Sequence, residues 1–298
     1  MFKIRVAIPT FIYTLLTICL IAPIKSTLAS DTPPLEIKIY NADEHSFHVN
    51  AVLIAAKKQA VLIDSGFTRA DALRISASIL DSGKELTHIL VSNADPDYYF
   101  GLHQIKQFFP AAKIVASAAV RARIAAKMQA KLAYWGPRMA ANAPQDLILP
   151  ELLQEATLDL EGHKLELRGS TGVLAYRPYV WIPDLQAIVG NVAVFSGLHV
   201  WTADAATPVL QQAWLHQLEE MRQLQPSLVV PGHMRAGSNT DLTSLKFTEN
   251  YLRDFQRATL ESQNSAELIK KMREIYPALG MSLALEIGAK VAKGELQW

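Results

Sequence analysis

The chain has 298 residues, of which 50% are hydrophobic and 19% are charged, and its formal net charge is +1 at pH 7. This length and composition predict a sizeable hydrophobic core, in one large domain or two small ones. The balanced charge and the lack of a basic cluster argue against nucleic acid or an anionic surface as partner. We therefore expect a small-molecule substrate, and the sequence predicts no particular oligomeric state.

Residues 1–29 have the layout of an export signal. Two cations precede an apolar run over residues 7–22, and Thr27-Leu-Ala29 is a small-x-small cleavage pattern. An uncleaved N-terminal anchor is the alternative. Cleavage after Ala29 removes three cations and Cys19, the only cysteine, which changes the formal charge from +1 to −2. We expect a periplasmic or secreted protein with no disulfide, no thiolate metal site and no stable membrane association after cleavage.

Strand patterns dominate the start of the mature chain. Three strands are expected there, at 35–40, 46–55 and 59–63. An amphipathic helix over 70–80 follows, and a short apolar run at 88–91 predicts a buried strand. The apolar spacing then predicts a helix over 98–109 and a strand over 113–116. This alternation of strands and helices predicts parallel strand pairs.

An asparagine and two carboxylates lie between the strand at 88–91 and the helix that follows it. Asn93, Asp95 and Asp97 are the residues concerned. In α/β proteins ligands bind at this place, because the strand end leaves room and the helix start offers unpaired N–H groups. Asp97 is also a suitable N-cap, and Asn93 and Asp95 suit a turn, so a local structural role is the alternative.

The stretch from Thr87 to Gly101 resembles the Thr-His-x-His-x-Asp-His-x-x-Gly motif of the metallo-β-lactamase fold superfamily. Asn93, Asp95 and Tyr98 stand where that motif has histidines, whereas Asp97 and Gly101 match it. The resemblance covers about residues 35–245. It implies an α/β fold of the four-layer αβ/βα type, in which two mixed sheets lie face to face with helices outside.

Four further segments resemble the family's loops. Gly169-Ser170-Thr171-Gly172 lies where the family has Gly-His-Thr-x-Gly, and Asn191 follows Gly190 where the family has a metal-bridging Asp. The run Leu228-Val-Val-Pro-Gly-His233 matches the final strand and ligand loop, with its histidine kept. The resemblance also implies that Asp64 supports the metal-ligand loop; an ordinary turn residue is the alternative.

The resemblance implies that segment 117–150 is an insertion that covers the mouth of the site. It combines a basic helix over 118–135 with a loop rich in Gly, Pro and Asn. Trp135 and Arg138 are candidates for a lid, although a Trp beside a Gly-Pro turn more often serves the core.

The second half of the chain is expected to complete the sandwich and to end in helices. The expected strands are 156–160, 163–167, 173–176 and 180–182, and the expected helices are 208–224, 248–262, 266–276 and 283–293. We treat 30–245 as the main domain and 246–298 as a C-terminal helical extension. His199 and Asp204, in the loop before the first of these helices, either reach the site or only fix their own loop.

The resemblance implies a hydrolase in which a metal-bound water attacks an ester, lactam, lactone or phosphoester. The predicted metal ligands are Asp95, Asp97 and His233, with Asn93, Tyr98, Asn191 and His199 as weaker ones. Three strong donors favour a single divalent ion, zinc first and iron or manganese next. Asp97 is the predicted catalytic residue. Asp64, Ser170 and Asp204 are expected to support the ligands, and Trp135, Phe195 and Trp201 to line an apolar pocket.

Two alternatives need no metal. One is a catalytically inactive member of the fold that binds a small molecule or a partner. The other is a hydrolase in which Asp95 and Asp97 share a proton and supply the general base. A chelator distinguishes a metal hydrolase from a metal-free one, and the binding protein shows no turnover.

Overall fold

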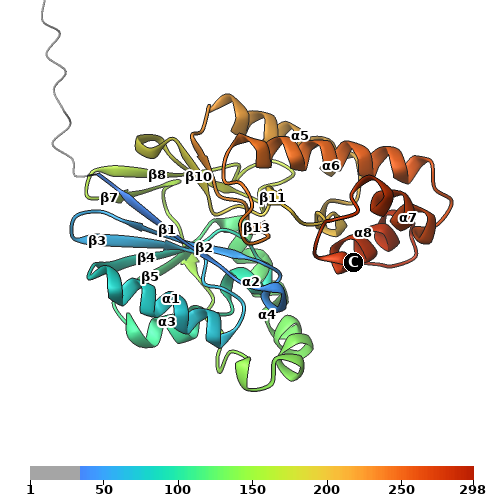
Figure 1. Cartoon of the computed structure of the whole chain (residues 1–298). Coiled ribbons are helices and arrows are strands. Elements are labelled where there is room, and N and C mark those ends of the chain that lie inside the picture. The colour runs from blue at the N-terminus through green and yellow to red at the C-terminus, as the bar shows by residue number, and fades with distance from the viewer. Residues whose placement is uncertain (1–33) are drawn as a thin grey trace, which may run out of the picture. The chain divides into compact units, whose positions relative to one another are not determined.

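Two β-sheets organise the chain in the computed structural model, which describes residues 34–298 (Figure 1). The predicted export signal lies outside these described residues. The first sheet has six strands in the order β1-β2-β3-β4-β5-β6. These strands are β1 (Glu36–Asn41), β2 (Asn50–Ala55), β3 (Gln59–Ile63), β4 (Glu85–Val91), β5 (Lys113–Ala116) and β6 (Glu151–Leu152). The pairs β3–β4 and β4–β5 are parallel, as predicted.

The second sheet has five strands in the order β12-β10-β9-β8-β7, and β11 and β13 form a separate parallel pair. The strands are β7 (Thr157–Leu160), β8 (His163–Arg168), β9 (Tyr179–Ile182), β10 (Ala187–Val189), β11 (Phe195–Ser196), β12 (Leu228–Val229) and β13 (His233–Met234). The prediction of a strand at 173–176 is wrong. That segment folds into turns, because the N–H groups of Ala175 and Arg177 bond to carbonyls three residues earlier rather than to a neighbouring strand.

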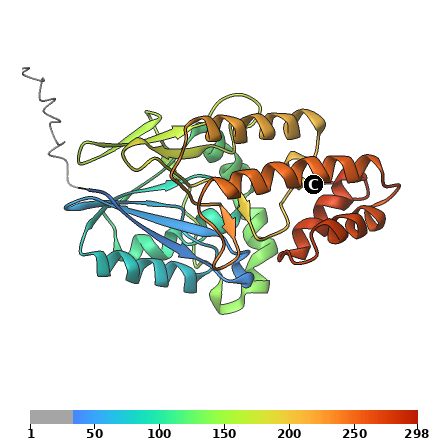
Figure 2. The same cartoon turned by 45° about the horizontal axis from the view of Figure 1, so that its top comes forward.

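Apolar side chains fill three interfaces, and this gives the predicted order helix, sheet, sheet, helix (Figure 2). Ile54, Ile63 and Val180 belong to the cluster between the sheets. The outer face of the first sheet packs on α1 (Arg69–Ser82), α3 (Leu102–Phe108) and α4 (Ala118–Met139). Each fully buried aliphatic side chain stabilises the fold by about 1.5–3 kcal/mol.

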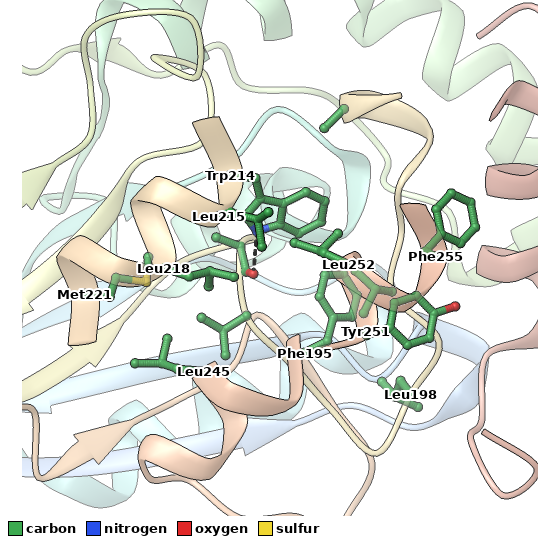
Figure 3. Packing of buried hydrophobic residues seen from close by; sticks show 14 of the residues in the cluster. Phe195, Leu198, Trp214, Leu215, Leu218, Met221, Leu245, Tyr251, Leu252 and Phe255 are labelled. Carbon is green, nitrogen blue, oxygen red and sulfur yellow. Dashed lines mark hydrogen bonds between the residues drawn. The ribbon is translucent and has the colours of Figure 1, made fainter. Parts of the chain in front are cut away.

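The outer face of the second sheet packs on α5 (Pro208–Gln223) and α6 (Leu242–Leu260). Trp214 of α5 is fully buried there beside Phe195 and Tyr251, and its indole N–H donates to the Ala193 carbonyl at 2.8 Å (Figure 3). The same cluster includes residues of α7 (Ser265–Ile275) and α8 (Ser282–Ala292). The predicted boundary at residue 245 therefore falls inside a continuous helix.

The predicted helix over 98–109 is divided into α2 (Pro96–Tyr99) and α3, with Gly101 between them. Gly101 packs directly on the loop after β3, since a Cβ atom at this position would lie 2.0 Å from the Ser65 carbonyl oxygen. Short 3-10 turns lie at Glu44–Ser46, Ala140–Asn142, Pro183–Leu185 and Ala203–Ala205. Within the described residues, no helix combines the length and apolar character that crossing a membrane requires.

Candidate active site

The loop that follows β4 is held from behind by Asp64. This side chain is 1% exposed and accepts two hydrogen bonds from Ser92, one from the backbone N–H and one from the hydroxyl, both at 2.7 Å. Burial raises the pKa of Asp64 to about 7, although both bonds act to lower it. Asp64 thereby fixes the first residue of the segment that carries Asn93, Asp95 and Asp97.

The loop brings Asp97 against His233. The Oδ2 atom of Asp97 lies 3.5 Å from Nε2 of His233, and both side chains are buried. Burial raises the pKa of Asp97 well above its ordinary range, and the Asp95 carboxylate raises it further. Burial lowers the pKa of His233 to about 4. The two pKa values are therefore displaced in opposite directions, and each displacement favours the uncharged form of its group.

The orientation of the His233 ring is fixed on three sides. Its Nδ1 lies 2.8 Å from the Phe47 carbonyl, which only accepts, so Nδ1 carries the proton and Nε2 has a free lone pair. Phe195 stacks on one ring face with centroids 5.1 Å apart, and Tyr98 packs edge-on at 5.7 Å. This arrangement presents Nε2 to Asp97 as a base.

An apolar cavity of about 340 Å³ opens above this pair. Asp95, Asp97 and His233 are its acidic and basic lining residues, with Lys131. Its walls are aromatic and aliphatic side chains from distant segments: Phe47, Phe67, Tyr134, Trp135, Val192, Trp201, Met281, Leu283, Ile287 and Trp298. Trp135 packs edge-on against Phe47 and Phe67, so it belongs to an aromatic cluster and also lines the cavity. Arg138, the other lid candidate, stacks on Tyr134 with its Cζ 3.8 Å from the ring centroid.

Several predicted site residues lie elsewhere. Phe195 was expected in the pocket wall but lies behind the His233 ring, and it does not line the cavity. His199 contacts the Tyr251 hydroxyl at 3.0 Å within the helical core, where burial lowers its pKa to about 4. Ser170 lines neither this cavity nor the polar cleft beside it. Asp204 accepts hydrogen bonds from the indoles of Trp201 and Trp298 at 2.8 and 3.0 Å.

Sequence reasoning missed the C-terminal part of the cavity wall. Met281, Leu283, Ile287 and Trp298 come from a segment that was expected to be an extension without a role in the site. The apolar positions of the last helix were visible in the sequence. Only the tertiary structure shows that this helix faces the loop after β4.

Comparison with known proteins is consistent with this geometry. The family model described as "Metallo-beta-lactamase superfamily" matches residues 46–233, more than half of the chain. The chain belongs to the metallo-beta-lactamase superfamily. Membership supports a hydrolase-type function, and members of this superfamily generally bind divalent metals.

Solved structures show the same fold at low sequence identity. A metallo-beta-lactamase from Pontibacter korlensis has a TM-score of 0.52 and 18% identity, over 76% of this chain and 98% of that one. A metallo-beta-lactamase family protein from Thermus thermophilus has a TM-score of 0.59 and 14% identity, over 88% and 93%. The DIM-1 metallo-beta-lactamase has a TM-score of 0.52 and 17% identity, over 75% and 99%. No curated protein matches the sequence.

The donor set at the metallo-beta-lactamase loops does not fit a divalent ion in the predicted way. In residues 34–298 no three His, Asp, Glu or Cys side chains converge closely enough to hold a metal, so Asp95 does not complete a site with Asp97 and His233. Zinc sites normally need three protein donors.

The replaced ligand positions have other roles. The Asn93 side-chain oxygen accepts from the Asp95 N–H at 2.8 Å. Asn191 accepts from the Val194 N–H at 2.8 Å and donates to the Val230 carbonyl at 3.0 Å. The Tyr98 hydroxyl is buried without a partner among the described residues. It lies against the backbone of Gly232, where a Cβ atom would be 2.6 Å away. The two amides thus hold loops together, and their oxygens are already engaged.

Proposed function

We propose that this chain is a hydrolase that acts on a small, mostly apolar ester in the aromatic cavity, with Asp97 as general acid and His233 as general base. One observation supports this proposal above the others: two buried groups 3.5 Å apart have pKa values displaced in opposite directions, and both line an apolar cavity. Titratable pairs separated in this way mark acid and base roles.

The proposed reaction needs only these two groups and water. His233 Nε2 takes a proton as the water oxygen bonds to the ester carbonyl carbon. Asp97 hydrogen-bonds the carbonyl oxygen and gives its proton to the departing alcohol oxygen as the C–O bond breaks. The imidazolium then returns its proton to Asp97, across a gap that shortens when substrate is bound. The products are a carboxylic acid and an alcohol, and the enzyme is restored.

The low pKa of His233 limits the range of substrates that the Asp97–His233 pair can hydrolyse. A base with a pKa of about 4 is neutral at pH 7 but removes a proton from water only weakly. We therefore expect activated esters to be cleaved and amides, lactams and phosphoesters to be poor substrates. Binding without turnover is the second candidate function. The weak basicity of His233 favours it, because a weak base activates water poorly.

The test is the hydrolysis of 4-nitrophenyl butanoate by the wild-type chain, Asp97→Asn, His233→Gln and His199→Gln. His199 is the matched control, because its pKa is also lowered to about 4 but it lines no cavity with Asp97. We expect kcat/KM to fall by about 10²–10⁴ in the two site variants and to change less than threefold in His199→Gln.

The pH profile provides a second readout. Activity should rise as pH passes about 4, where His233 loses its proton, and fall again above the raised pKa of Asp97. The alkaline fall should disappear in Asp97→Asn. If the wild-type chain does not hydrolyse the ester but still binds apolar alcohols, the result would support the second candidate function, binding without turnover. Equal turnover in all four proteins would refute the assignment of the acid and the base.

We also propose that the protein is exported and acts in the periplasm or outside the cell. The support is the pattern of cations, apolar run and Thr27-Leu-Ala29 in the sequence. Intact-mass analysis of the protein recovered from a bacterial periplasm should give a chain that begins at Ser30. A chain that begins at Met1 would favour the uncleaved anchor.

A further inference from the structure

A polar cleft lies beside the aromatic cavity and shares Asp95, Lys131 and Val192 with it. Four cations line the cleft, namely Arg123, Lys127, Lys131 and Arg177, against two acids, Asp95 and Asp204. Its free volume is about 20 Å³, roughly the space that one or two buried waters need. The surplus of positive charge favours an anionic group, and the volume limits that group to a small one.

Arg177 is the most informative residue of the cleft. Its side chain is 2% exposed, yet no carboxylate of the described chain lies within the 4.0 Å that defines an ion pair with it. Its guanidinium stacks 3.9 Å from the Trp214 ring centroid and donates one hydrogen bond, to the Val192 carbonyl at 3.2 Å. Its Nε has no partner among the described residues. A buried cation without a direct ion pair destabilises the fold, and burial lowers the pKa of Arg177 although Asp204 and Asp95 favour its charged form.

The two acids of the cleft act on Arg177 through space, and neither forms an ion pair with it. The Asp204 carboxylate is directed to the indole N–H groups of Trp201 and Trp298. Asp95 lines both cavities and accepts no hydrogen bond at its carboxylate from the described residues. With both acids ionised, the cleft still has an excess of two positive charges.

We propose that the cleft binds the carboxylate of the ligand whose apolar body fills the aromatic cavity, so that the substrate is a small ester carrying a free carboxylate. This inference rests on the proposed function, because it assigns the substrate class of the same site. A planar guanidinium matches a carboxylate better than it matches a single point charge. Asp95, Lys131 and Val192 line both cavities, so the two are adjacent, as the proposal requires.

The test compares two probes that share an apolar body, 4-phenylbutanoate and 4-phenylbutan-1-ol, by calorimetry at low salt. Wild-type protein should bind the carboxylate at least tenfold more tightly than the alcohol, and salt should reduce this preference. The double variant Arg123→Gln/Lys127→Gln should reduce it below threefold and leave alcohol binding unchanged, since neither residue lines the aromatic cavity. Lys246→Gln/Lys270→Gln removes the same charge from exposed helix positions and should retain the preference.

Arg177→Met provides an independent measurement. Without ligand this variant should be at least as resistant to urea as the wild type, because it removes an unpaired buried charge, and it should show no preference for the carboxylate. If Arg177→Met does not fold, the double variant Arg123→Gln/Lys127→Gln still tests whether the cleft binds the carboxylate. If the wild type binds both probes equally, the carboxylate site in the cleft is refuted, but ligand binding in the aromatic cavity is still supported. Failure of both probes to bind at millimolar concentration would overturn the proposed function as well.

Discussion

Two buried carboxylates, Asp71 at the start of α1 and Asp97 in the lining of the cavity, have opposite electrostatics. Their exposure is nearly the same, 3% and 6%. Burial raises the pKa of both. At Asp71, however, hydrogen bonds from Ser46, Tyr40 and Thr68 outweigh it and hold the pKa below its ordinary value. Asp97 has no such donors among the other residues of the described part of the chain, and its pKa rises well above the ordinary value.

Asp64 lies between these two cases. It receives two hydrogen bonds, both from Ser92, and its pKa is about 7. Asp71 receives four, from Tyr40, Ser46 and both polar groups of Thr68, at 2.6–3.0 Å. The pKa is thus lowest where the hydrogen-bond donors are most numerous, and Asp71 is also less deeply buried than Asp64 and Asp97. At the site, burial with few hydrogen-bond donors raises the pKa of Asp97.

The largest effect should come from the same substitution at both carboxylates. Asp71→Ala leaves several buried donors without an acceptor and removes the capping box of α1, so we expect a loss of about 3 kcal/mol or more in unfolding free energy. Asp97→Ala removes a carboxyl that satisfies no donor from another residue in 34–298, and we expect a loss of less than about 1 kcal/mol. Urea denaturation of the two variants measures both quantities.

Activity provides the control for this pair. Asp71 lies outside the cavity, so Asp71→Ala should retain the kcat/KM of the wild type under conditions where it is folded. Asp97→Ala should lose turnover. Similar stability losses in the two variants would contradict the role assigned to hydrogen-bond donors.

A smaller effect is expected from pH acting on Asp64. Its folded pKa of about 7 lies above the ordinary value of 3.8, so the folded state binds more protons than the unfolded state between these values. Stability from this group is complete below about pH 4 and is lost as pH rises through 7, by at most about 1.4 kcal/mol per pH unit. In Asp64→Asn the decline between pH 5 and 7 should be shallower.

Urea midpoints at several pH values measure this slope. Asp71→Asn is the matched control, because Asp71 has a lowered pKa and its contribution is lost only as pH falls below the ordinary range. An unchanged slope in Asp64→Asn would show that other groups cause the decline.

The fold was predictable from sequence because the motif glycines meet steric demands. Gly101 contacts the Ser65 carbonyl, and at Gly232 a Cβ atom would lie 1.8 Å from the Asn191 carbonyl oxygen. Such contacts need glycine whatever chemistry the loops perform, so the loops kept their pattern although most of the motif's histidines are replaced. Asp97 and His233 were therefore placed together correctly, and their 3.5 Å contact follows from the same loops.

The rest of the site depends on contacts between distant segments. Arg177 follows a stretch that was predicted to be a strand, and nothing local marks it as a buried cation. Trp298 meets Trp201 and Asp204, which lie 94 or more residues earlier in the chain. The third metal ligand, Asp95, was predicted from its place in the family motif, but the motif does not show that Asp95 faces the cleft as well as the cavity.

The smallest expected effect is that of added metal. A divalent ion on Asp97 would act as the donors do at Asp71, by stabilising the ionised carboxylate, and would raise the melting temperature by mass action. At a concentration one hundred times its Kd it would add about 2.7 kcal/mol. Because two donors 3.5 Å apart do not make a closed site, we expect 1 mM zinc, manganese or iron(II), compared with EDTA, to shift Tm by less than about 1 °C. Ester turnover should change less than twofold. A rise of several degrees that is lost in both Asp97→Ala and His233→Ala would show that the pair holds a metal after all, and Asp97 would then resemble Asp71 in its charge.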